Sequence, residues 1–136
     1  MTASENKAAI TAAFAHLARG DGQPFVALMA EDFTWIFKGS TNWQGCYRGK
    51  STVRAELLGP LFANFSGTYT STARRIIAED DIVVVECEGC VATKAGDRYD
   101  NKYCYVIRMH EGKMLELTEY MDTALADRVL APPRHA

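Results

Sequence analysis

The second half of the chain is a series of strand-like segments joined by very short turns. Runs rich in β-branched and aromatic residues occupy residues 69–77, 82–93, 99–109 and 113–121, a composition typical of strands. The turns between them are Asp80-Asp81, Ala95-Gly96-Asp97 and Glu111-Gly112, and such residues favour reversals of the chain. Because turns this short join antiparallel neighbours, the pattern predicts a four-strand antiparallel meander.

The first half is predicted to hold three helices. Thr2 and Glu5 have the spacing of a capping box, and apolar residues follow at helical spacing at Ile10, Ala13, Phe14 and Leu17. Pro24 suits the first turn of a second, short helix that carries Phe25, Leu28 and Met29. Ser51 is expected to cap a third helix, which Pro60 kinks or shortens and which bears Val53, Leu57, Leu58, Leu61 and Phe62.

One strand and a polar loop separate the second and third helices. Residues 32–37 alternate Phe33, Trp35 and Phe37 with Thr34 and Ile36, which predicts a strand. Residues 39–49 are rich in Gly, Ser, Thr and Asn, which predicts a loop, and this loop holds two aromatic residues, Trp43 and Tyr47. Together these elements indicate an α+β fold, in which a strongly curved antiparallel sheet forms a cone. Three N-terminal helices would close the cone around an interior pocket, where small molecules commonly bind.

Length and charge limit the organisation and the partners of the chain. Its 136 residues fit one domain over residues 1–136, with a core at about residues 5–130 and a frayed tail at 131–136. The net charge of −2 at pH 7 argues against nucleic-acid and membrane partners, which favour a basic excess. No apolar run is long enough for a bilayer and no secretory signal is visible, so we expect a cytoplasmic protein.

The spacing of cysteine and histidine predicts neither a metal site nor a redox pair. Cys87 and Cys90 have the C-x-x-C spacing, but residues three apart on a strand project to opposite faces. The four cysteines are expected to be buried thiols: Cys46, Cys87, Cys90 and Cys104. The three histidines are scattered, and no glycine-rich phosphate-binding motif occurs. We therefore expect no metal and no cofactor.

Alternation along the predicted strands groups several polar residues on single faces. Glu86, Glu88 and Cys90 share a face of one strand. A face of the next strand carries Asn101, Tyr103, Tyr105 and Ile107, and a face of the last carries Leu115, Leu117 and Glu119. If these faces are concave, three glutamates lie in the pocket beside Tyr99, Asn101 and Tyr103. In the alternative, the glutamates face solvent and pair with Arg74, Arg75 or Lys102.

Carboxylates gathered in a dry pocket favour acid–base chemistry. Desolvation and mutual repulsion raise the pKa of at least one of them, and a raised pKa suits proton transfer near neutral pH. The pocket would be walled or covered by four aromatic residues, namely Trp35, Phe37, Trp43 and Tyr47. For Trp35 and Phe37 a plain core role is an equal alternative, because aromatic residues dominate cores.

Four short segments together resemble the SnoaL-like branch of the nuclear-transport-factor-2-like superfamily. They are Ala30-Glu31-Asp32-Phe33 leading into Trp35, Gly45-x-Tyr47-x-Gly49-Lys50, Glu111-Gly112-Lys113-Met114, and Glu119-Tyr120-Met121-Asp122. The resemblance extends over about residues 7–130 and implies the cystatin-like cone described above. Polyketide cyclases, ketosteroid isomerases and limonene-epoxide hydrolases are relatives, so the resemblance leaves the reaction open.

The resemblance bears on individual positions. Glu119 is at the place where SnoaL-like cyclases carry an aspartate base, and Glu88 is where the epoxide hydrolases have a second aspartate. The hydrolase arginine corresponds to Glu86, and its tyrosine and asparagine correspond to Trp35 and Phe37. Phe37 also replaces the ketosteroid isomerase base, and Tyr105 replaces the cyclase histidine. Epoxide hydrolysis and steroid isomerisation in their known forms are thus disfavoured.

These patterns lead to one principal hypothesis and two alternatives. The chain would be a cofactor-independent isomerase, cyclase or lyase acting on a small hydrophobic carbonyl compound. Glu119 would be the base and Glu88 a second acid, and Tyr103 or Asn101 would steady the enolate oxygen. The pocket would also use Glu86, Tyr99, Tyr105 and Leu117. Alternatively, the protein binds a ligand without catalysis, or it is an interaction module with a filled cone.

The outward face of the sheet suggests a second copy of the chain as partner. We expect this face to present a partly apolar set of residues, Val83, Val85, Cys87, Cys104 and Val106. Relatives of the resembled fold commonly form dimers through that face, which implies a homodimer here. Asp122 is expected to be structural and to cap a helical segment at residues 123–129.

Overall fold

A computed structural model describes residues 1–133, and the first two helices lie close to where the sequence predicts them. α1 spans Ala3–Leu17 and begins with a capping box. The Thr2 hydroxyl accepts from the Glu5 N–H at 3.1 Å, and the Glu5 carboxylate accepts from the Thr2 N–H at 3.0 Å. α2 spans Gln23–Ala27 with Pro24 in its first turn. Met29, expected on this helix, instead begins the first strand.

Six strands form a single mixed sheet in the order β2-β1-β6-β5-β4-β3. The predicted meander is confirmed, because β3 to β6 pair antiparallel with their sequence neighbours. β1, however, pairs parallel with β6, so the expectation of a purely antiparallel sheet was wrong. A short strand in the predicted loop, β2, extends the sheet beyond β1. The strands are β1 Met29–Phe37, β2 Gly45–Arg48, β3 Phe65–Glu79, β4 Ile82–Thr93, β5 Lys102–His110 and β6 Lys113–Met121.

The third helical region is continuous but irregular. It consists of α3 at Lys50–Thr52, the π-helical segment η1 at Val53–Leu58, and α4 at Gly59–Phe62. The cap position is held by Gly49 at φ +94°, with no side-chain hydrogen bond, so the prediction of Ser51 as the cap was wrong. Pro60 has no N–H and crowds the preceding turn. The wide π turn directly before it lets the helix continue.

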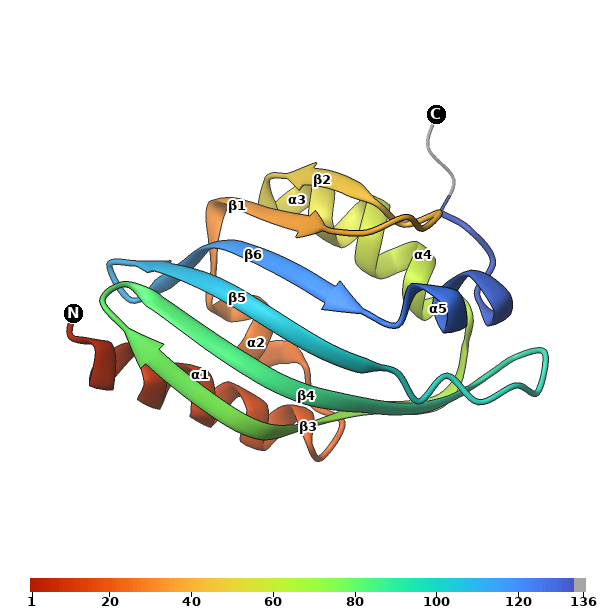
Figure 1. The fold of residues 1–136 in the computed structure, drawn as a ribbon, viewed down its shortest axis with the longest axis horizontal. Coiled ribbons are helices and arrows are strands. Elements are labelled where there is room, and N and C mark those ends of the chain that lie inside the picture. The colour runs from red at the N-terminus through yellow and green to blue at the C-terminus, as the bar shows by residue number, and fades with distance from the viewer. Residues whose placement is uncertain (134–136) are drawn as a thin grey trace.

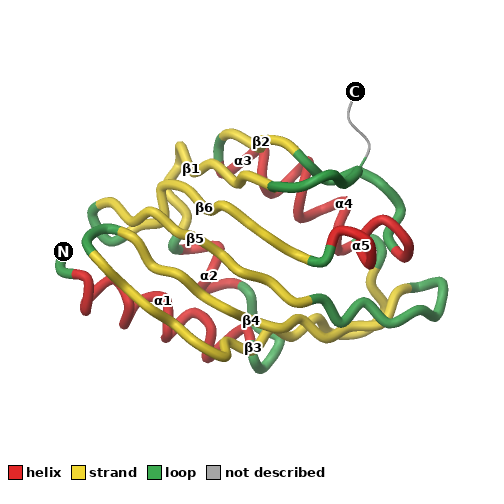
Figure 2. The backbone as a smooth tube through the Cα atoms, in the orientation of Figure 1, coloured by secondary structure: helices red, strands yellow, loops and turns green. Residues whose placement is uncertain are grey.

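The helices α1, α2 and α3–α4 lie behind the sheet in Figure 1, and Figure 2 shows the strands as one curved layer in front of them. α1 packs against β3 and β4, and α3 packs against β1. The α+β arrangement is therefore confirmed. α5, at Thr123–Val129, follows β6, and the Asp122 carboxylate accepts from the Leu125 N–H at 3.2 Å, as predicted.

The pairing register decides which face each residue of β4 occupies. Val85 lies opposite Tyr105 and Cys87 lies opposite Tyr103, and opposite residues project to the same side of a sheet. Cys87 therefore lies inside, together with Val83 and Val85. The prediction that these three residues lie on the outward face was wrong, whereas Cys104 and Val106 do lie there.

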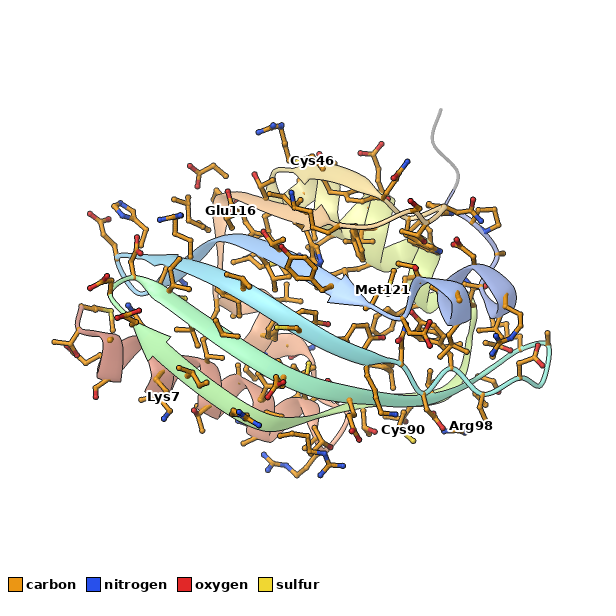
Figure 3. The ribbon with its side chains drawn as sticks, viewed as in Figure 1. Lys7, Cys46, Cys90, Arg98, Glu116 and Met121 are labelled. Carbon is orange, nitrogen blue, oxygen red and sulfur yellow. The ribbon has the colours of Figure 1, made fainter. Side chains whose placement is uncertain are left out.

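The cysteines differ from the expectation of four buried thiols. Cys87 is buried, Cys104 is half-buried, and Cys46 and Cys90 are exposed. Cys87 and Cys90 occupy opposite faces of β4, as the strand geometry predicts. Figure 3 shows Cys90 next to Arg98 near the end of the β4–β5 connection, where the guanidinium contacts the sulfur at 3.0 Å.

Within residues 1–133, no helix has the length and apolar character needed to cross a bilayer. Half of the predicted frayed tail, residues 134–136, lies outside the described residues.

Asn101 ties the start of β5 to the end of β6 from a buried position, with 1% of its surface exposed. Its amide donates to the Tyr99 hydroxyl at 2.9 Å and to the Asp122 carbonyl at 3.2 Å. Its Oδ1 accepts from the N–H groups of Lys102 and Asp122 at 2.7 and 3.2 Å. The Asn101 side chain therefore makes hydrogen bonds to four polar groups where β5 begins and β6 ends.

We expect Asn101→Ala to lower the free energy of unfolding by about 2–4 kcal/mol, because it leaves buried backbone groups unpaired. Urea unfolding monitored by circular dichroism measures the loss. Asn42→Ala, at an exposed loop position, is the control and should change stability by less than about 0.5 kcal/mol. Equal stability of both variants would contradict a structural role for Asn101.

Candidate functional site

A cavity of about 100 Å³ lies between the concave face of the sheet and the helices. Seven of the residues predicted for the pocket line it: Trp35, Phe37, Trp43, Tyr99, Tyr103, Tyr105 and Glu119. Apolar side chains from α1, α2, η1 and α4 close the other side, among them Leu17, Phe25, Leu57 and Leu61. The volume is that of several water molecules, which suits a small ring compound.

Glu119 is the carboxyl group of the cavity. The register places it between Tyr105 of β5 and Phe37 of β1, and only 3% of its surface is exposed. The Trp35 Nε1–H donates to its Oε1 at 3.2 Å. Burial raises the pKa of Glu119 to about 8, against the smaller lowering effect of the Trp35 bond. The carboxyl is therefore mostly protonated at pH 7.

Three aromatic residues, Trp35, Phe37 and Tyr105, surround Glu119. Trp35 stacks on Phe37 with ring centroids 6.0 Å apart and planes 9° apart, and it meets Tyr105 edge-on at 6.0 Å. All three rings are nearly fully buried and belong to the main core. The cavity wall and the core are thus the same structure, so the two alternatives for Trp35 and Phe37 do not exclude each other.

Three tyrosines add hydroxyl groups to the cavity. Burial raises the pKa of Tyr99 to about 12, despite its hydrogen bond from Asn101, and raises the pKa values of Tyr103 and Tyr105 well above 10. These hydroxyls stay protonated at neutral pH and can donate to a ligand oxygen. Asn101 does not line the cavity. Its amide instead donates a hydrogen bond to the hydroxyl of Tyr99, which does line the cavity.

Glu86 and Glu88 lie outside the cavity, on the outer face of the sheet. Glu88 Oε2 lies 3.2 Å from Arg74 Nη2, and Glu86 Oε1 lies 2.9 Å from Arg75 Nε. The prediction that they face the pocket was wrong, and the solvent-facing alternative is confirmed. The reason is the register, which pairs Glu88 with Lys102 rather than with an inward residue.

Two further predicted residues are buried without lining the cavity. Leu117 is part of the core beneath Trp35, its partner in the β1–β6 pairing. Tyr47 is buried and packs edge-on against Phe37 at 5.9 Å. Neither belongs to the cavity lining, so both are core residues on the same face of the sheet as Trp35.

Two polar residues of the lining, Tyr69 and Ser71 on β3, were not predicted from the sequence. They stand two positions apart, and this alternation was the signal that could have placed them on one face. Trp43 also lines the cavity, and its buried Nε1–H has no hydrogen-bond partner in the described chain. Among residues 1–133, no group of three or more His, Cys, Asp or Glu residues could hold a metal ion.

Comparison with known proteins places the chain in a family. The model of the SnoaL-like domain matches residues 10–117. The chain belongs to the SnoaL-like family. A relative of this SnoaL-like protein is the uncharacterized protein Rv0034 of Mycobacterium tuberculosis, 29% identical over 115 residues that cover 84% of this chain and 87% of the relative. The resemblance drawn from the four sequence segments is thereby confirmed.

Solved structures share the whole fold of this SnoaL-like protein. Bal32a, from a soil-derived mobile gene cassette, has a TM-score of 0.80 at 21% identity and covers 95% of this chain and 98% of its own. An NTF2-like protein from Burkholderia xenovorans LB400 has a TM-score of 0.71 at 23% identity, covering 96% and 99%. A candidate SnoaL-like polyketide cyclase from Jannaschia sp. CCS1 has a TM-score of 0.76 at 16% identity, covering 96% and 94%. The fold is NTF2-like.

The buried Glu119 makes stability depend on pH in a defined direction. Its pKa is about 8 in the folded chain and 4.5 without the fold, so the folded state holds one more proton between these values. Stability therefore falls as pH rises from about 5 to 8, by up to about 1.4 kcal/mol per pH unit from this group. Glu119→Gln, which cannot ionise, should gain stability relative to the wild type across this window.

Urea unfolding of the wild type and Glu119→Gln at pH 5, 6.5 and 8 tests this expectation. Glu79→Gln, at an exposed position, is the matched control and should follow the wild type at each pH. A constant difference between wild type and Glu119→Gln from pH 5 to 8 would show that Glu119 titrates as an ordinary glutamate.

Proposed function

We propose that this SnoaL-like protein is a cofactor-free isomerase, cyclase or lyase that moves a proton on a small hydrophobic carbonyl compound. The observation that carries the proposal is the placement of Glu119. It is the carboxyl group that lines an apolar cavity, with tyrosine hydroxyls beside it. A carboxyl in such surroundings is a stronger base than one in water, and it is also an effective acid at neutral pH.

The proton transfer follows from the groups in place. Ionised Glu119 takes a proton from the carbon next to the carbonyl group. The C–H electron pair becomes the new C=C bond, and the π electrons of the C=O bond move to the carbonyl oxygen. A protonated tyrosine, Tyr103, donates to that oxygen as its charge grows. Protonated Glu119 then returns the proton to carbon, which completes an isomerisation, or to a leaving group, which completes an elimination.

The Trp35 N–H supports this cycle by holding one oxygen of Glu119. The bond at 3.2 Å fixes Oε1, so that Oε2 is the oxygen left to exchange a proton with the ligand. The similarity to the candidate polyketide cyclase supports the same class of chemistry. A second acid is not part of the proposal, because Glu88 lies on the outer face.

Ligand binding without catalysis is the second candidate function. It is favoured by the buried Trp43 N–H, which has no hydrogen-bond partner among the described residues and lines the cavity. A ligand oxygen would satisfy this donor and remove the cost of leaving it unpaired. Such a role needs no ionised Glu119, so the Glu119→Gln variant separates the two functions.

The outer face of the sheet supports a second proposal, that two copies of the chain pair through it. One residue from each strand forms a mostly apolar row, and its members are Ile77, Val84, Val106, Thr118, Ile36 and Cys46. Charges of both signs flank the row, with Arg75 and Glu86 on one side and Arg108 and Asp81 on the other. Such a surface can pair with itself around a two-fold axis.

Hydrogen exchange at carbon tests the proton transfer without knowledge of the substrate. We expect the wild type to speed the exchange of the C2 protons of 1-tetralone in D₂O, measured by proton NMR. Glu119→Gln should reduce the protein-catalysed rate by about 10²–10⁴-fold, and Tyr103→Phe by about 10²–10³-fold. The rate should rise with pH and level off above about 8, since the ionised carboxyl is the base.

Glu79→Gln is the control for exchange and should retain the wild-type rate. Binding of 1-tetralone by the wild type and by Glu119→Gln is measured by calorimetry under the same conditions. Binding without any exchange catalysis would reject the enzymatic proposal for this ketone class and favour the binding function.

Light scattering coupled to gel filtration tests the homodimer. We expect the wild type to elute as a dimer and Val106→Arg to elute as a monomer, because a charge at the centre of the row weakens the interface by on the order of 30-fold or more. Lys94→Arg, in an exposed turn, is the control. A wild-type monomer at micromolar concentration would overturn the proposal.

A further inference from the structure

Gly89 leaves a space on the inner face of β4 that the Tyr69 hydroxyl fills. A Cβ atom at Gly89 would lie 2.6 Å from Tyr69 Oη and 3.0 Å from its Cε2. Real side chains do not pack this closely, so Tyr69 holds its position only because residue 89 has no side chain. Gly89 is paired with Ser71 of β3, which brings Tyr69 and Ser71 to the same part of the cavity.

Polar groups gather at this place. Ser71 lines the cavity with 3% of its surface exposed, and its hydroxyl, although close to the Cys87 thiol, makes no hydrogen bond of good geometry within the described chain. Burial raises the pKa of Tyr69 above its usual range, and Tyr103 is its hydrogen-bonding neighbour. Tyr69 therefore remains a donor, and Ser71 can donate or accept.

Tyr69 and Ser71 come from a different part of the sheet than Glu119. Glu119 is on β6 and Ser71 is on β3, three strands away in the order β6-β5-β4-β3. Both side chains point into the same cavity, which is otherwise mostly apolar. The cavity thus has one polar group toward β6 and another toward β3.

We propose that Tyr69 and Ser71 form a second polar subsite that binds a second oxygen of the ligand, and that Gly89 keeps this subsite open. The ligand is then a flat apolar frame with two oxygen functions, one directed to Glu119 and the other to Tyr69 and Ser71 on β3. Among the described residues, no Lys, Arg or His side chain lines the cavity. The second oxygen therefore belongs to a neutral hydroxyl or ketone group and not to a carboxylate.

The inference rests on the ligand cavity of the proposed function, but it does not require that Glu119 be catalytic. Calorimetric binding of two matched ketones, 1-tetralone and 6-hydroxy-1-tetralone, therefore tests it independently of turnover. We expect the wild type to bind the hydroxylated ketone about 3- to 10-fold more tightly, as one added hydrogen bond allows.

Tyr69→Phe and Ser71→Ala should each reduce this preference toward unity and leave the affinity for 1-tetralone within about twofold. Tyr120→Phe removes a tyrosine hydroxyl from the exposed outer face and should keep the preference. Gly89→Ala should lower the affinity for 6-hydroxy-1-tetralone more than that for 1-tetralone, because the added methyl displaces Tyr69.

Circular dichroism establishes that each variant is folded, and Tyr69→Phe keeps the test valid if Gly89→Ala does not fold. The subsite is rejected if the wild type shows no preference for the hydroxylated ketone, or if the preference survives in both Tyr69→Phe and Ser71→Ala. Failure of both ketones to bind the wild type would reject it as well. Loss of exchange catalysis in Glu119→Gln with an intact preference would leave the subsite supported, so the two proposals fail separately.

Discussion

Residues that lie opposite each other on neighbouring strands must project to the same side of the sheet, and the cavity depends on this constraint. The β4–β5 register places Val85 opposite Tyr105, and the β5–β6 register places Tyr105 opposite Glu119. β1 then adds Phe37 beside Glu119. This row runs across the concave face and brings a carboxyl group between two aromatic rings. A slip of one residue in the β5–β6 pairing would turn Glu119 to solvent.

The enclosure of Glu119 stabilises the core and also sets the chemistry. Aromatic side chains bury large apolar areas, and Trp35 supplies the hydrogen bond that a buried carboxyl needs. The same burial disfavours the charged form and raises the pKa to about 8. The protein thereby carries a group that is costly for stability above pH 5 but useful for proton transfer. Strained or costly groups of this kind are typical of functional sites.

Much of the fold could be predicted, because most of its signals are local. Turn residues and β-branched runs delimited β4 and β6 at their observed bounds, and the capping box located the start of α1. β2 was missed because four residues in a polar loop carry no periodic signal. The parallel pairing of β1 with β6 was missed because it joins segments about 80 residues apart, and nothing local encodes which edge of the meander receives β1.

The sequence by itself determined most of the elements and their order and singled out Glu119 as a candidate, since these follow from composition, turn chemistry and family motifs. The tertiary structure decided which polar residues share the cavity. Period-two alternation defines two faces for a strand but does not say which one is buried. On β4 the apolar residues Val83 and Val85 and the polar Glu86 and Glu88 alternate, and the register with β5 sent the glutamates outward. Tyr69 entered the cavity because Gly89, twenty residues later in the chain, leaves space for its hydroxyl, a contact that exists only once β3 and β4 are paired.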